Sequence, residues 1–63
     1  MDMKLYYANV EVSCVEYFEE NLNERKDLVE IMSKEFKTSE NGTQYIRYVL
    51  AAKEGVIAPE YAL

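Results

Sequence analysis

The sequence has 63 residues, a net charge of −5, one cysteine (Cys14) and no histidine. This composition excludes an internal disulfide, a histidine-dependent nucleophile and the usual zinc sites, because these need a second cysteine or imidazole ligands. A chain of this length is expected to form one small domain, residues 1–63, that buries only about 60% of the surface exposed by its unfolded form. Because so small a core stabilises a fold only narrowly, we expect a homodimer.

The cellular location is expected from what the sequence lacks. No apolar run approaches the roughly 18 residues that span a membrane, and the N-terminal MDMK lacks the apolar core of a signal peptide. We therefore expect a cytoplasmic protein without membrane binding. Cys14 is expected to be a small buried residue in a reducing compartment.

The segment from Lys4 to Cys14 alternates apolar and polar residues, as a half-buried strand does. Its content of Val and Tyr favours the same structure. The inner face of this predicted strand would carry Tyr6, Ala8, Val10, Val12 and Cys14.

The segment from Asn23 to Phe36 predicts an amphipathic helix, because its apolar residues fall on one side at about 100° per residue. These residues are Leu28, Val29, Ile31, Met32 and Phe36. Asn21 stands three residues before Glu24, as in a capping box, which favours a start near this point. A single longer helix from Ser13 to Lys37 is the alternative, because the three-four spacing continues upstream through Val15, Phe18 and Leu22.

Turn residues occupy the segment TSENGT, from Thr38 to Thr43. We interpret it as a helix-to-strand loop, although Asn41-Gly42 also fits a β-hairpin that would pair Thr38 with Tyr45.

A second strand is predicted over Gln44–Ala52. Its inner face would carry Ile46, Tyr48, Leu50 and Ala52. A helix is the alternative here, because helix formers precede Gly55, which would suit a helix C-terminus. The remaining segment, Val56–Leu63, contains Pro59 and predicts an edge segment or a tail that packs Val56, Ile57 and Tyr61.

The predicted order of strand, helix, strand and tail is an α+β fold, a small β-α-β unit. A two-stranded sheet is marginal and leaves its edges open, which is a second reason to expect that a homodimer completes the sheet. The apolar side of the predicted helix is wider than such a sheet can cover. The predicted oligomer interface is Leu28, Met32 and Phe36.

The negative charge is concentrated between Glu11 and Glu30, where seven acidic and two basic residues give −7 + 2 = −5. Direct binding to nucleic acid is not expected, because phosphate contacts need clustered Lys and Arg. A basic surface on another protein is the expected partner, with exposed tyrosines as anchors. The predicted partner-binding residues are Tyr7, Glu11, Glu16, Tyr17, Glu19, Glu20, Glu24 and Tyr45. The alternatives are that the charge serves solubility alone and that the tyrosines only stabilise the sheet.

No stretch of the sequence carries a phosphate-binding glycine loop or a calcium-binding loop, so we expect no enzyme, no cofactor and no metal site. In size and charge the chain resembles phage-encoded inhibitors of host defence or of host nucleic-acid enzymes. That resemblance implies a small acidic interaction protein, encoded by a phage or mobile element, that binds and inhibits a host protein in an anti-defence role. The alternative is an antitoxin-like or assembly subunit completed by a cognate partner, and the third possibility is an uncatalogued enzyme or ligand-binding domain.

Overall fold

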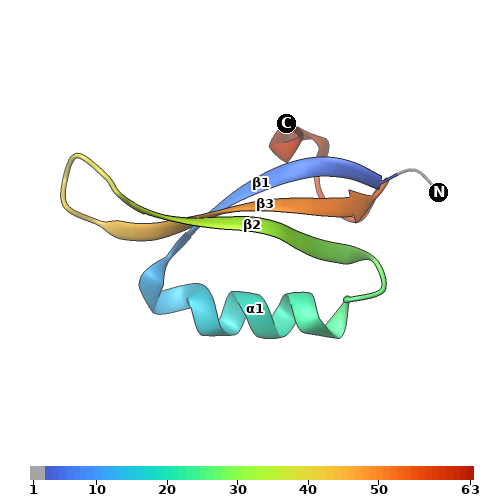
Figure 1. Ribbon diagram of the computed structural model, residues 1–63, viewed down its shortest axis with the longest axis horizontal. Coiled ribbons are helices and arrows are strands. Elements are labelled where there is room, and N and C mark those ends of the chain that lie inside the picture. The colour runs from blue at the N-terminus through green and yellow to red at the C-terminus, as the bar shows by residue number, and fades with distance from the viewer. Residues whose placement is uncertain (1–2) are drawn as a thin grey trace.

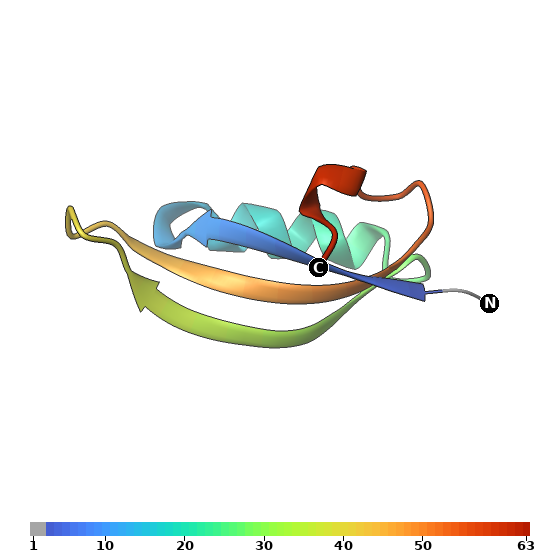
Figure 2. The same ribbon diagram turned by 90° about the horizontal axis from the view of Figure 1, so that it is seen from above.

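The computed structural model describes residues 3–63 as one antiparallel sheet with a helix on one face (Figures 1 and 2). The main elements are β1 (Met3–Glu11), α1 (Val15–Glu24), β2 (Val29–Thr38) and β3 (Gln44–Lys53). Two short 3-10 helices, η1 (Val12–Cys14) and η2 (Pro59–Tyr61), complete the described chain. The strands lie in the order β1-β3-β2. The α+β class is confirmed, but the chain order is strand, helix, strand, strand instead of β-α-β.

Helix α1 forms over residues whose apolar side chains recur at helical spacing. Val15, Phe18 and Leu22 all pack against the buried core. The helix ends at Glu24, and a turn closed by backbone hydrogen bonds from Leu28 N and Val29 N to Arg25 O, at 2.8 and 3.0 Å, leads into β2. The predictions of a helix over Asn23–Phe36 and of a longer one from Ser13 to Lys37 are therefore wrong.

A β-bulge explains why the sequence of β2 imitates a helix. The register of β2 against β3 shifts between Ile31 and Ser33. Before the shift, the residues on the helix-bearing face are odd-numbered, Val29 and Ile31; after it they are even-numbered, Lys34 and Phe36. Because the extra residue interrupts the two-residue period, the apolar positions fall at intervals that resemble those of a helix.

The β2–β3 connection is the hairpin that the sequence offered as an alternative. Thr38 pairs with Gln44, one residue from the pairing suggested by the Asn41-Gly42 turn. Ser39 N donates a 2.9 Å hydrogen bond to Thr43 O. Gly42 has a φ of +87°, which glycine adopts without the steric cost that a Cβ would add. The helix-to-strand loop predicted here is therefore wrong.

The two predicted strands, which correspond to β1 and β3, are confirmed, with one correction. Tyr6 and Val10 of β1 are buried, as are Tyr48, Leu50 and Ala52 of β3, so the helix alternative for β3 is wrong. Strand β1 nevertheless ends at Glu11, and η1 turns the chain toward α1. Cys14 is therefore exposed at a turn and is not a buried strand residue.

The C-terminal segment packs as a tail and covers the free edge of β1. Val56 and Ile57 contact the core. Ala62 forms an isolated antiparallel bridge with Tyr6, and Leu63 N donates a 3.0 Å hydrogen bond to Leu5 O. Figure 2 shows the tail beside β1, at the opposite side of the sheet from β2. The edge at β1 is thus partly closed, whereas β2 is the other outer strand.

Candidate interaction surfaces

The outer face of α1 carries three of the acidic residues predicted to bind a partner. Glu16, Glu20 and Glu24 are exposed and follow one another at four-residue intervals, so they form one line along the helix, which we call the acidic stripe. At 100° per residue the stripe lies roughly 130° to 170° around the axis from the core-facing residues. Tyr17 lies beside the stripe and is 73% exposed.

The charges of the acidic stripe are unfavourable for the helix that carries them. Like charges four residues apart destabilise a helix by roughly 0.2 to 0.5 kcal/mol per pair. Glu24 also lies in the last turn, where the helix dipole disfavours a negative charge and where α1 has no basic residue. Within residues 3–63, the salt bridges involve Glu19, Glu35 and Glu54 and none of the stripe. A basic partner would relieve this repulsion.

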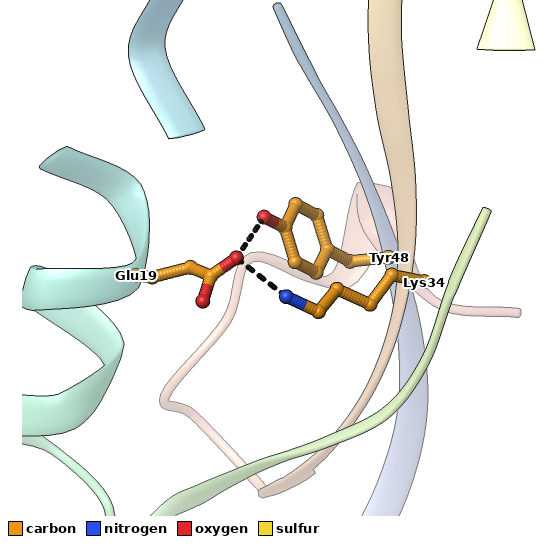
Figure 3. A network of polar contacts seen from close by, with 3 residues as sticks. All are labelled: Glu19, Lys34 and Tyr48. Atoms are coloured by element: carbon orange, nitrogen blue, oxygen red, sulfur yellow. Dashed lines mark hydrogen bonds and ion pairs between the residues drawn. The ribbon is translucent and has the colours of Figure 1, made fainter. Parts of the chain in front are cut away.

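Glu19 lies on the flank of α1 that faces β2, where it joins three elements (Figure 3). Its Oε2 accepts a 2.7 Å hydrogen bond from the Tyr48 hydroxyl and a 2.9 Å hydrogen bond from Lys34 Nζ. The buried Tyr48 ring packs against Phe18, with 4.8 Å between the ring centroids. The network therefore connects α1 to β2 through Lys34 and to β3 through Tyr48.

The contacts of this network shift the pKa values of both Glu19 and Tyr48. The hydrogen bond from Tyr48, followed by that from Lys34, lowers the pKa of the Glu19 carboxyl below its ordinary value. Burial, followed by the hydrogen bond to Glu19, raises the pKa of the Tyr48 hydroxyl. At pH 7 Glu19 is thus ionised and Tyr48 is neutral, and neither is suited to proton transfer near that pH. The network holds α1 against β2 and β3.

A groove runs between α1 and β2 on the helix-bearing face of the sheet. Its apolar lining residues are Met3, Val12, Val15, Leu22, Val29, Ile31, Phe36 and Ile46. Acidic residues from α1 and the following turn border it: Glu16, Glu19, Glu20 and Asp27. Phe36 is 62% exposed at the groove, so α1 leaves the Phe36 end of β2 uncovered, whereas Val29 at its start is buried.

The predicted tyrosines and acidic residues do not form one surface. Tyr7 and Tyr45 lie on strand positions that face away from α1. The Tyr7 ring meets Tyr61 edge-on at 6.3 Å, and the Arg47 guanidinium lies 5.1 Å from its centroid. Glu11, the last residue of β1, stands at the opposite end of η1 from α1. Of the three predicted tyrosines, the structure brings only Tyr17 together with the acidic stripe.

The residues predicted to form an oligomer interface are exposed, but not on a helix. Phe36 and Met32 belong to β2 and are 62% and 55% exposed. Met32 falls at the bulge, and Leu28 lies in the turn before β2. An interface along one side of a helix is therefore excluded for these residues. Phe36 and Met32 are nevertheless exposed on the edge strand β2.

Sequence reasoning missed the role of Lys34 and the groove beside it. Both depend on β2 being a strand, which places Lys34 opposite Tyr48 in the ladder. The only local signal was Phe36, which stands between the charged Glu35 and Lys37 a few residues before the Asn41-Gly42 turn. The bulge upstream concealed it.

No protein-family model matches the chain, and no similar curated protein or solved structure was found. Among residues 3–63, no helix is long and apolar enough to cross a membrane. In the same part of the chain, no group of three or more potential ligand side chains is placed to hold a metal ion.

Proposed function

We propose that this chain is a non-enzymatic interaction protein that binds a basic surface of a host protein through the outer face of α1 and thereby inhibits it. The observation that supports this most is the acidic stripe of Glu16, Glu20 and Glu24 beside the exposed Tyr17. A basic partner would offset the repulsion within the stripe. Tyr17 would add a large contact area at low entropy cost.

Inhibition would follow from competition. A protein surface that binds nucleic acid presents clustered Lys and Arg to phosphates. A line of carboxylates held on a rigid helix can occupy such a surface and exclude its normal ligand without any chemistry. This proposal places the chain among the small acidic anti-defence inhibitors of phages and mobile elements, and it implies a cytoplasmic location, where the target would lie. We also propose self-association as a homodimer, which does not depend on the inhibitor function.

The test begins with the immobilised chain and a lysate of host cells. Captured proteins are identified by mass spectrometry, and we expect one basic protein whose retention falls as salt rises, because screening weakens exposed charge pairs. Adding the purified chain in excess should then abolish the activity of that protein. If the captured protein keeps its full activity at saturation, the inhibitor function is wrong.

Charge reversal tests the surface itself. The triple variant Glu16→Lys, Glu20→Lys and Glu24→Lys should bind at least tenfold more weakly, while Glu19 is left intact because it contacts Tyr48 and Lys34. A matched control changes the net charge equally at exposed acids away from α1: Glu40→Lys, Glu54→Lys and Glu60→Lys. Equal weakening of both variants would show that overall charge, and not the stripe, governs binding.

An antitoxin-like or assembly subunit is the second candidate, and the open apolar groove between α1 and β2 favours it. A cognate partner could fill that groove with an apolar segment. This candidate predicts that the chain gains substantial stability only when the partner is co-expressed. A chain that unfolds cooperatively on its own, with unchanged midpoint in the presence of the captured protein, would contradict it.

A further inference from the structure

The two edge strands of the sheet, β1 and β2, differ in how far other parts of the chain cover them. The edge at β1 is covered in part by the tail, through the Ala62–Tyr6 bridge and the Leu63–Leu5 hydrogen bond. The edge at β2 has no neighbouring strand among residues 3–63. An exposed edge strand presents backbone donors and acceptors that another strand can pair with.

Strand β2 is complementary to itself. Its ladder with β3 has nine pairs, from Val29 to Thr38, because the register shift passes over one residue. Lys34 occupies the fifth and central position of the nine. Two antiparallel copies of β2 centred on Lys34 therefore match each position with its mirror position, with equivalent residues on the same face of the sheet.

The mirror positions pair compatible side chains. On the helix-bearing face, Ile31 of each copy would lie opposite Phe36 of the other, which would cover the exposed Phe36. On the opposite face, Glu30 of each copy would lie opposite Lys37 of the other. Apolar pairs and pairs of opposite charge at directly opposed positions are those that stabilise antiparallel strands. Each kind of pair occurs twice because of the two-fold symmetry.

The centre of this pairing brings two Lys34 residues together. Each lysine already forms a 2.9 Å salt bridge with Glu19 of its own copy. The central cluster would thus contain two lysines and two carboxylates, with a summed charge of zero. Like-charge repulsion between the lysines is offset within the cluster.

We infer that β2 is the homodimer seam of this protein. Two copies join antiparallel about a two-fold axis at Lys34 and form a six-stranded sheet in the order β1-β3-β2-β2-β3-β1. Both α1 helices lie on one face of that sheet, and a tail covers each outer edge. The pairs of the seam use residues of β2 and none of the acidic stripe, so the seam does not rest on the proposed function. The opposing explanation is a monomer whose bulge and charges guard the edge against pairing.

A charge-swap series tests the register. Light scattering and sedimentation equilibrium across a wide range of protein concentration should show a dimer. Glu30→Lys or Lys37→Glu alone places two like-charge pairs in the seam and should weaken dimerisation roughly tenfold or more. The double variant restores opposite charges at both pairs and should recover dimerisation. A monomer at every concentration, or a double variant no better than the single ones, would overturn the seam.

Cross-linking tests the two-fold axis directly, and Cys14→Ser provides a background without thiols. In that background, Lys34→Cys places a thiol opposite its own copy and should give a disulfide-linked dimer on oxidation. Thr38→Cys is the matched control on the same strand, because its copies would lie roughly 25 Å apart at the strand rise per residue. Circular dichroism verifies that both variants stay folded. Efficient cross-linking at position 38 with none at position 34 would refute the proposed register.

Discussion

The Tyr48 hydroxyl and the Glu19 carboxylate, 29 positions apart in the sequence, meet in a 2.7 Å hydrogen bond where the core reaches solvent. Phe18, the residue before Glu19, packs against the same tyrosine ring. These two adjacent contacts fix the rotation of α1 about its axis as well as its position over the sheet. The outward direction of Glu16, Glu20 and Glu24 follows from that rotation. The packing of one buried tyrosine therefore determines which side chains of α1 a partner can reach.

Tyr48→Phe should lower the free energy of unfolding by about 1 to 2 kcal/mol, because it removes a hydrogen bond to a charged group and keeps the buried ring. Chemical denaturation followed by circular dichroism measures the change. Tyr17→Phe is the control, since that side chain is 73% exposed and its hydroxyl is not buried. Equal midpoints for Tyr48→Phe and the parent protein would show that the hydrogen bond contributes nothing to stability.

The same pair predicts how stability depends on pH. The pKa of Glu19 is lowered by folding, so its contribution is present above its ordinary value of 4.5 and is lost as the pH falls through the lower folded value. The pKa of Tyr48 is raised by folding, so its contribution is present below its ordinary value of 10.0 and is lost as the pH rises beyond it. Unfolding measured over pH should show both losses.

Tyr48→Phe provides the comparison for these pH effects. The alkaline loss that arises from Tyr48 should disappear, because the titrating hydroxyl is gone. The acidic loss should become smaller, because the hydrogen bond from Tyr48 is the largest cause of the lowered pKa of Glu19. Two pH profiles that run parallel at both extremes would contradict the assigned coupling.

Leu50→Ala should destabilise the protein by about 2 to 5 kcal/mol, because it removes a side chain that is only 2% exposed at the centre of β3. In so small a domain this loss approaches the whole stability, so we expect a largely unfolded variant. Leu5→Ala is the control on the neighbouring strand, since Leu5 is 50% exposed and its truncation should cost much less. Circular dichroism and thermal unfolding measure both. A folded, cooperative Leu50→Ala variant would show that the core lies elsewhere.

Strands β1 and β3 could be predicted because their side-chain period is uninterrupted. In β3, the core residues Tyr48, Leu50 and Ala52 stand at every second position, and the helix-bearing face follows directly from that pattern. In β2 the bulge after Ile31 moves Phe36 onto the face of the odd-numbered residues. No local period reveals such an insertion, because it is specified by pairing with β3. The helix was consequently predicted over Asn23–Phe36, most of which forms β2, whereas α1 lies upstream at Val15–Glu24.

Of the candidate site, the acidic residues of α1 could be predicted to lie together, but the positions of the tyrosines could not. Acidic residues four apart lie on one side of a helix, so Glu16, Glu20 and Glu24 remain together, whereas Glu19 faces β2. Tyr7 and Tyr45 were grouped with them by their predicted exposure alone. Which face of the sheet a strand residue occupies depends on where α1 packs, and that depends on tertiary contacts such as Tyr48 with Glu19.

Gly42→Ala should destabilise the hairpin by about 1 kcal/mol, because Gly42 has a φ of +87° and a Cβ disfavours that conformation. No atom lies within 4 Å of the added Cβ, so the cost comes from the backbone and not from a clash. Gly42→Asn should cost less, because Asn tolerates positive φ better than Ala. Denaturation midpoints give the order; equal losses for both variants would point to another cause.

Deletion of Ala62 and Leu63 should expose the edge of β1 and increase association. The deletion removes the Ala62 bridge to Tyr6 and the 3.0 Å hydrogen bond from Leu63 N to Leu5 O, which together occupy backbone groups on that edge. A sheet freed at this side can pair with further chains, so light scattering should show species larger than those of the parent protein. Leu63→Ser is the matched control: it keeps the backbone N–H, and its 65% exposed side chain contributes little burial. If the control associates as strongly as the deletion, the effect comes from the leucine side chain; if neither associates, the tail does not protect the edge of β1.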